Sequence, residues 1–236
     1  MDKYIRAAQS KILEVFSTHS RSFALAGGTA LELYYLQHRY SKDLDFFSPA
    51  YDVGEIENLV MEFGRYIGSP INLMDELSVA NRAKVRFYTV SIDGAGYPLK
   101  IDFVEDVFFK NPQIRRFNGT PVYDVTHMYA QKIFAVTGTR LDTTAMGGPA
   151  ITGRNAIRDV VDLYFLSNKI QPLHQFLKTL PQAQRRGMVL WYRGYSRLDL
   201  KLGLSDLDLY EPPLDGGKVV SYLDNEIKQL IKEELS

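Results

Sequence analysis

A Gly-Gly-Thr turn followed closely by two alternating aspartates is the feature that most constrains how this chain can fold. The turn, Gly27-Gly28-Thr29, ends a short apolar run, and Asp43 and Asp45 follow with one residue between them. Residues two apart on a strand point to the same face, so both carboxylates can hold one hard divalent cation. A glycine turn that leads into a helix can bring backbone N–H groups against a phosphate. The order predicts a strand, turn and helix beside a metal-binding strand.

A third acid stands inside a later apolar segment. Residues 84–92 and 99–104 are predicted strands, and a glycine-containing turn between them suits an antiparallel hairpin. Asp102 has an apolar neighbour on each side, and a carboxylate is costly to bury alone. We therefore expect a neighbouring strand to bring Asp43 and Asp45 to the same cation as Asp102.

The remaining periodicities predict a chain that becomes helical in its second half. Apolar residues at helical spacing predict helices over residues 5–16, 30–36, 53–67, 124–137, 155–166, 172–180, 182–192 and 221–235. Short apolar runs predict strands over residues 22–26 and 43–47. Thr29 is expected to cap the helix that follows it. A linker is expected within residues 111–123, and a glycine-rich loop over residues 142–149.

Composition excludes several classes of site. The chain has 236 residues, of which 45% are hydrophobic, enough for a substantial core. It has no cysteine, which excludes disulfides, zinc-thiolate sites and thiol catalysis. No apolar stretch reaches the roughly 18 residues of a membrane span, so we expect a soluble, cytoplasmic protein without a membrane partner. Lys plus Arg equals Asp plus Glu at 28 each, so any nucleic-acid binding must come from a local patch.

Together these motifs resemble the signature of the AbiEii/AbiGii-type nucleotidyltransferases, which belong to the DNA polymerase β-like nucleotidyltransferase superfamily. The resemblance covers about residues 20 to 170, and it is carried by Gly27-Gly28-Thr29-Ala30-Leu31, residues 38–47, Lys100-Ile101-Asp102, Gln131-Lys132-Ile133 and residues 158–164. It implies an α/β (α+β) fold. A polymerase β-like nucleotidyltransferase core with a mixed sheet is expected over residues 1–115. A helical region that closes over the nucleotide site is expected over residues 116–236.

The resemblance also implies a reaction. A nucleoside monophosphate would pass from an NTP to an acceptor hydroxyl, with release of pyrophosphate. Asp43 and Asp45 would bind Mg²⁺, or alternatively Mn²⁺, while Asp102 would be the third acid and would help to orient or deprotonate the acceptor. Characterised relatives that resemble this chain are toxins of toxin–antitoxin or phage-defence systems, with RNA, and tRNA ends above all, as the acceptor. An NTP, an RNA and a cognate antitoxin are thus the expected partners.

Phosphate contacts are expected beside the acids. Gly27, Gly28 and Thr29 form the predicted phosphate-binding turn, and Ser41 and Lys42 just before the acids are predicted to join it. The preceding His38-Arg39 can contact phosphate or acceptor, although a lone histidine more often has a structural role.

Two predicted helices carry further candidates. By pattern alone, Lys132 among apolar neighbours suits a solvated lysine as well as a triphosphate contact, and the resemblance favours the contact. Arg158 and Asp162, four residues apart, suit a surface ion pair. The resemblance brings this helix to the nucleotide, so Arg158 and Asp159 are expected nucleotide contacts, and Asp159 can equally position Lys132.

Other function classes stay open on the residues alone. One is a nucleotidyltransferase that modifies a protein or a small molecule, which the neutral net charge favours. Another is a nucleotide-binding module without catalysis, which the complete set of acids disfavours. A metal-dependent nuclease would also use clustered acids and a lysine, but the glycine turn ahead of the acids disfavours it. Finally, the basic and aromatic residues Arg185, Arg186, Arg193, Tyr195 and Arg197 suit either an RNA-binding patch or a solvated helix face.

Overall fold

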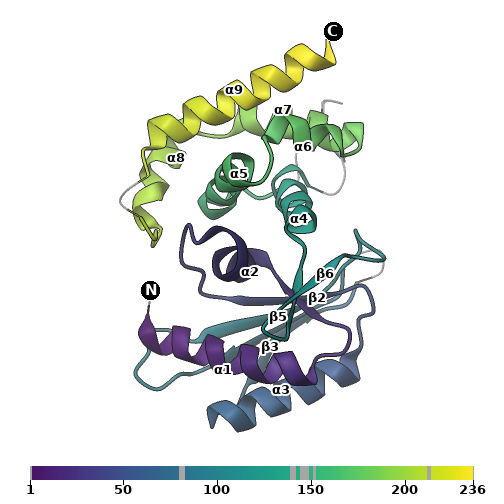
Figure 1. Cartoon of the computed structure of the whole chain (residues 1–236), viewed down its shortest axis with the longest axis vertical. Helices are drawn as coiled ribbons and strands as arrows, with labels where there is room; N and C mark the ends of the chain where they lie inside the picture. Colours follow the sequence, from purple (N-terminus) through teal and green to yellow (C-terminus); the bar gives the residue numbers. More distant parts are fainter. Residues whose placement is uncertain are drawn as a thin grey trace. The chain divides into compact units, whose positions relative to one another are not determined.

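A computed structural model describes residues 2–79, 83–138, 142–143, 149–150, 153–211 and 214–235. Contacts divide the chain into two compact units, Met1–His127 and Met128–Ser236, coloured purple to teal and teal to yellow in Figure 1. Within the described ranges, every helix is too short or too polar to cross a membrane.

In the described part of the first unit, seven strands form one mixed sheet in the order β3-β4-β5-β2-β1-β7-β6. The strands are β1 (Ala24–Ala26), β2 (Leu44–Ser48), β3 (Asn72–Leu77), β4 (Val85–Val90), β5 (Leu99–Glu105), β6 (Ile114–Phe117) and β7 (Thr120–Tyr123). β2 lies between β1, to which it is antiparallel, and β5, to which it is parallel. β4 and β5 pair antiparallel, as the hairpin prediction requires. The mixed sheet, followed by helices, confirms the predicted α/β (α+β) class.

Buried and half-buried residues alternate along β2, so one face of the strand belongs to the core and the other carries Asp45. Phe46 is fully buried and packs between Phe16 of α1 (Lys3–His19) and Phe63 of α3 (Val53–Ile67), with ring centroids 4.2 and 5.9 Å away. Both helices lie along the same side of the sheet in Figure 1. Since successive side chains of a strand point to opposite faces, Asp45 faces away from this core.

The glycine turn begins a continuous helical segment that is α-helical at first and then π-helical. α2 (Gly27–Leu31) continues directly into the π-helical turn η1 (Glu32–Leu36). Gly27 has φ +68°, a left-handed conformation that glycine adopts without strain, and it turns the chain from β1 into the helix. The helix thus begins before Thr29, and the capping role predicted for Thr29 is wrong. Its hydroxyl instead donates to the backbone carbonyl of Asp43.

The second unit is mainly helical in the residues described. Its elements are the greater part of α4 (Val125–Thr137), β8 (Asp142–Thr143), β9 (Pro149–Ala150), α5 (Ile157–Lys169), α6 (Leu173–Lys178), α7 (Gln182–Gly194), α8 (Arg197–Gly203), the 3₁₀ turn η2 (Leu204–Asp206) and α9 (Gly216–Glu234). Most of the predicted glycine-rich loop, residues 144–148, lies outside the described residues. Leu163, Leu177, Met188 and Leu223, from four of the helices, are buried in its core.

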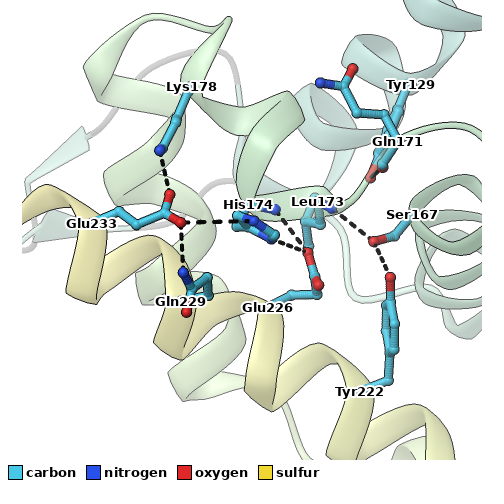
Figure 2. Close-up of polar contacts among 10 residues, drawn as sticks. All are labelled: Tyr129, Ser167, Gln171, Leu173, His174, Lys178, Tyr222, Glu226, Gln229 and Glu233. Atoms are coloured by element: carbon cyan, nitrogen blue, oxygen red, sulfur yellow. Dashed lines mark hydrogen bonds and ion pairs between the residues drawn. The ribbon is translucent and has the colours of Figure 1, made fainter.

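A polar cluster fastens α9 to α6. Nδ1 and the backbone N–H of His174 lie 2.8 and 2.9 Å from Oε2 of Glu226. Glu233 pairs with Lys178 and lies 3.9 Å from Nε2 of His174. Figure 2 shows both glutamates pointing from α9 toward α6. The charged C-terminal helix is therefore an integral part of the second unit.

The predicted linker is wrong because most of residues 111–123 form a hairpin. β6 and β7 pair antiparallel around Asn118 and Gly119, which have φ of 48° and 87°. Asn-Gly with positive φ at both positions is a strong hairpin signal. β7 then pairs with β1 through Val122 and Leu25, so the first unit continues to His127, beyond the predicted boundary at residue 115.

Candidate active site

Two carboxylates meet on adjacent inner strands. Asp45 of β2 and Asp102 of β5 are direct partners in a parallel register. Adjacent strands lie about 4.8 Å apart, and paired residues point to the same face. Both aspartates are half-buried, whereas Leu44 and Ile101 on the opposite face are fully buried. The neighbouring strand thus brings Asp102 beside Asp45, while a cation shared by all three acids stays a prediction.

Asp43 lies one residue before β2 and is half-buried as well. Across the residues that the structure describes, no three His, Cys, Asp or Glu side chains are placed to hold a metal ion together. Asp43, Asp45 and Asp102 therefore do not close a three-ligand site by themselves. Mg²⁺ commonly takes one or two carboxylates and completes its shell with water and substrate phosphates. The paired Asp45 and Asp102 fit a cation that arrives with a nucleotide.

The two glycines of the turn touch the acid-bearing segment directly. A Cβ atom at Gly27 would lie 2.0 Å from Oδ2 of Asp45. A Cβ atom at Gly28 would lie 2.7 Å from Oγ of Ser41 and 2.9 Å from Nη2 of Arg39. Any larger residue would displace these groups, so the close approach itself requires glycine. Arg39 is only 4% exposed, which puts a buried positive charge beside the turn.

The segment before β2 lies against the same turn. Thr29 binds the carbonyl of Asp43, and the hydroxyl of Ser41 faces the turn. Lys42 is exposed, with its Nζ 5.0 Å from the centre of the Tyr97 ring. The structure thus brings the glycine turn, Thr29 and Ser41 into contact with the segment that carries the acids, whereas the described contact of Lys42 is with Tyr97.

In the second unit, Lys132 is a buried, ion-paired residue. It is 6% exposed, and its Nζ lies 2.8 Å from both Oδ1 of Asp159 and Oδ2 of Asp162. Arg154 binds the same Asp159 with its Nε at 2.6 Å. The solvated-lysine interpretation is wrong, and the expected contact between Lys132 and Asp159 is confirmed. Arg158, which lies on α5 with Asp159 and Asp162, is exposed.

The charge of Asp159 depends on these partners. Burial by itself raises the pKa of Asp159, but the positive charges of Lys132 and Arg154 outweigh it and hold the pKa below the ordinary value of 3.8. Asp159 is therefore ionised at neutral pH and is a fixed negative partner for Lys132.

The basic and aromatic cluster of α7 and α8 is largely used inside the fold. Arg185 pairs with Glu234 at 2.5 Å. Arg197 binds backbone carbonyls of residues 192 and 195 and stacks 4.1 Å from the Tyr192 ring. Tyr195 is buried. These contacts give Arg185, Tyr195 and Arg197 structural roles, while Arg186 and Arg193 of the same cluster are exposed.

Sequence reasoning missed three residues that hold the candidates in place and misplaced a fourth. Gln9 and Glu32 bind the backbone of Ser41, and Arg154 binds Asp159 beside Lys132. Asp162, which suited a surface ion pair with Arg158, is instead fully buried and pairs with Lys132. Asp162 follows Asp159 by three residues, so helical spacing could have placed it on the same face. An acid between Leu31 and Leu33 is a comparable signal for Glu32. Nothing in the spacing marks Gln9 or Arg154.

Comparisons with solved structures find the same fold in other proteins. The crystal structure of JHP933 from Helicobacter pylori is 16% identical, with 99% of this chain and 96% of that chain covered and a TM-score of 0.59. A provisionally named H. pylori nucleotidyltransferase is also 16% identical, with 100% and 99% covered and a TM-score of 0.59. At this identity the likeness establishes the fold alone. No curated protein sequence matches the chain.

A family model, described as "Nucleotidyl transferase AbiEii toxin, Type IV TA system", matches residues 11–211 and so covers most of the chain. The match includes the glycine turn, the paired acids and the ion-paired lysine, all of which the structure describes. The chain belongs to the AbiEii nucleotidyltransferase toxin family, and it is a nucleotidyltransferase.

Proposed function

We propose that this nucleotidyltransferase moves a nucleoside monophosphate from an NTP to a hydroxyl group of an RNA, with release of pyrophosphate. The observation that carries the proposal is the pairing of Asp45 with Asp102, directly beside the glycine turn. The two carboxylates would bind a cation and the glycine turn would bind phosphate, so both would contact the same triphosphate. This juxtaposition is what phosphoryl transfer requires, because its catalysis is mostly positioning and charge stabilisation.

The acids have separate proposed roles. Asp43 and Asp45 would hold Mg²⁺, or Mn²⁺ in its place, with water and substrate phosphates in the rest of the shell, and Asp102 would be the third acid that orients or deprotonates the acceptor hydroxyl. When bound, the cation neutralises charge that develops on the phosphates and lowers the pKa of the attacking hydroxyl. The half-buried position of all three side chains leaves them accessible to a substrate.

The phosphate-binding residues of the first unit are Gly27, Gly28, Thr29, Ser41 and Lys42 in this proposal. Its support is the contact of Gly27 with Asp45, of Gly28 with Ser41 and of Thr29 with the carbonyl of Asp43. Lys42 is included because it lies between Ser41 and Asp43 in the chain. In the second unit, Lys132, Arg158 and Asp159 are proposed nucleotide contacts, as the family resemblance implies. Lys132 has three N–H donors, of which two serve Asp159 and Asp162, so one can serve a phosphate oxygen. Closure of the helical region over the nucleotide stays a prediction.

The proposed acceptor and partner rest on membership of the family. The family description names a type IV toxin–antitoxin system, which implies a cognate antitoxin. We propose RNA, with tRNA ends first, as the target of the toxin. A protein or a small molecule is the alternative acceptor.

The test is incubation of the purified protein with total tRNA, Mg²⁺ and each α-labelled NTP in turn. Asp45→Asn is the inactive variant, and Asp75→Asn, an exposed acid on β3, is the matched control. We expect label in RNA with wild type and Asp75→Asn only, and none when EDTA replaces Mg²⁺. Label in the protein would replace the RNA acceptor by a protein acceptor. Shortened RNA would indicate a nuclease, and NTP binding without turnover a non-catalytic module.

A further inference from the structure

We propose that Glu32 is a positioning residue that fixes Ser41 and thereby sets the affinity of the candidate active site for NTP. The inference rests on the proposed nucleotidyl transfer. Glu32 follows the helix that begins at the glycine turn, and its backbone N–H donates to the carbonyls of Gly28 and Thr29. The inference concerns its side chain.

The position of Glu32 is unusual for an acid. It is fully buried, at 0% exposure, and is the first residue of the π-helical turn η1. Its Oε2 accepts a 2.7 Å hydrogen bond from the backbone N–H of Ser41, and Oε1 pairs with Arg6 of α1. A buried carboxylate costs several kcal/mol unless its charge and hydrogen bonds are satisfied. Its described partners include one arginine, Arg6, and the backbone N–H of a predicted phosphate-binding residue, Ser41.

A second side chain holds the other side of Ser41. Gln9 of α1 is also fully buried, and its Nε2 donates to the carbonyl of Ser41 at 3.2 Å. Both backbone polar groups of Ser41 are therefore bound by side chains from distant parts of the chain. Arg6 and Gln9 precede the residues that the family model matches, 11–211. We call Glu32 and Gln9 together the brace of Ser41. Gln9, and the Arg6 that pairs with Glu32, lie outside the family match.

The brace decides which group of Ser41 can bind phosphate. Because the N–H of Ser41 donates to Glu32, it is not available to a ligand. The hydroxyl faces Gly28, beside the guanidinium of Arg39, and is the remaining donor of Ser41. Loss of the brace would let the hydroxyl turn away from the phosphates. Asp45 and Asp102 would keep their positions, since they are held by the pairing of β2 and β5.

The expected signature is a change in KM rather than in kcat. In Glu32→Gln the amide keeps the shape of the side chain but loses the charge that pairs with Arg6. We expect KM for the NTP, and the dissociation constant of the Mg²⁺–NTP complex measured by calorimetry, to rise about tenfold, while kcat changes less than about threefold. Such a split marks an interaction that acts on binding. Ser41→Ala should raise KM by a similar factor, and the double variant by no more than Ser41→Ala alone.

Glu55→Gln is the matched control. Glu55 is another buried carboxylate of the same unit, and it accepts the backbone N–H groups of Arg21 and Ser22 at 2.7 and 3.0 Å. We expect this variant to lose thermal stability and to keep the wild-type KM. Gln9→Met is a second test of the brace that leaves no buried charge unpaired, and it should raise KM about threefold even if Glu32→Gln does not fold.

Two results would overturn the proposal. One is that Glu32→Gln and Gln9→Met, wherever they fold, have the same KM and the same affinity for Mg²⁺–NTP as the wild type. The other is an equal loss of stability and of kcat in Glu32→Gln and Glu55→Gln, which would make Glu32 purely structural. Failure of the proposed function looks different, because the wild-type protein itself would then neither bind Mg²⁺–NTP nor differ in turnover from Asp45→Asn.

Discussion

Gly27 and Asp45 approach each other so closely that a single methyl group on Gly27 would overlap the carboxylate, with 2.0 Å between the added Cβ and Oδ2. Gly27 also has φ +68°, so the position requires glycine for its conformation and for its space. The turn and the acid are therefore one structural feature, although they come from different elements of the chain.

Replacement of Gly27 by alanine should affect both properties. We expect Gly27→Ala to displace the Asp45 carboxylate and to lower nucleotidyl transfer by about a hundredfold, because small displacements at a reacting centre cost roughly this much. The left-handed conformation should add a loss of about 1–2 kcal/mol in the free energy of unfolding. Gly68→Ala is the control, since Gly68 has φ +79° and no atom within 4 Å of the added Cβ. Equal activity in the two variants would separate Gly27 from the reaction.

Asp45→Asn should separate activity from stability. We expect transfer to fall by about a hundredfold or more, because a ligand of the cation is lost. The melting temperature without Mg²⁺ should stay the same or rise, since like charges at paired positions of adjacent strands destabilise a sheet. Activity assays and thermal melts of Asp45→Asn and Asp75→Asn would check both statements. A large fall in the melting temperature of Asp45→Asn alone would make Asp45 a structural residue.

Removal of the Lys132 charge should destabilise the second unit. In Lys132→Met, Asp159 and Asp162 would remain buried with less positive charge, which should cost about 3–5 kcal/mol. Trp191 is the only tryptophan of the chain and is buried in this unit, so its fluorescence follows the unfolding of this unit in urea. The double variant Lys132→Met/Asp162→Asn should recover part of the loss. If the single variant is as stable as wild type, the ion-paired cluster contributes nothing to folding.

The lowered pKa of Asp159 predicts a dependence of stability on acid. A carboxyl group whose pKa is lower in the folded protein stabilises it above the unfolded value, here 3.8, and loses that contribution as the pH falls below it. We expect the difference in free energy of unfolding between wild type and Asp159→Asn to be constant from about pH 7 to pH 5. It should shrink below about pH 4. Trp191 fluorescence in urea titrations at several pH values would measure it, and a difference that grows in acid would contradict the assignment.

Local patterns predicted the fold where an element has its own signal. The helix over residues 53–67 has the predicted bounds, because its apolar face is regular and Asp52 caps it. The strands around Asp45 and Asp102 follow from alternation, and their adjacency follows from the cost of burying a lone acid. β3 escaped prediction because all six of its residues are exposed, so it carries no alternation of burial. The β6–β7 hairpin escaped prediction because neither of its four-residue strands alternates between buried and exposed residues, which leaves the Asn-Gly turn as its local signal.

In the candidate site, the residues that could be predicted are those proposed to bind the cation or the nucleotide directly. Glycines, paired acids and an isolated lysine have chemical reasons to occur in that order. Gln9, Glu32 and Arg154 act on other residues of the protein instead, at separations of 32, 9 and 5 residues from their partners, and no helix or strand spacing connects them. Contacts of that kind are set by tertiary packing, which one sequence does not reveal.

The inner position of β2 and β5 has a consequence for how the enzyme loses activity. The edges of the sheet are β3 and β6, and the strands that carry Asp45 and Asp102 are separated from both. Edge strands open in local fluctuations that cost little free energy, whereas inner strands separate only when most of the structure opens. Transient fraying, or a proteolytic nick at the exposed β3, would therefore leave the two acids side by side. The carboxylate pair is thereby protected from local opening at either edge, and it separates only when the inner part of the sheet unfolds.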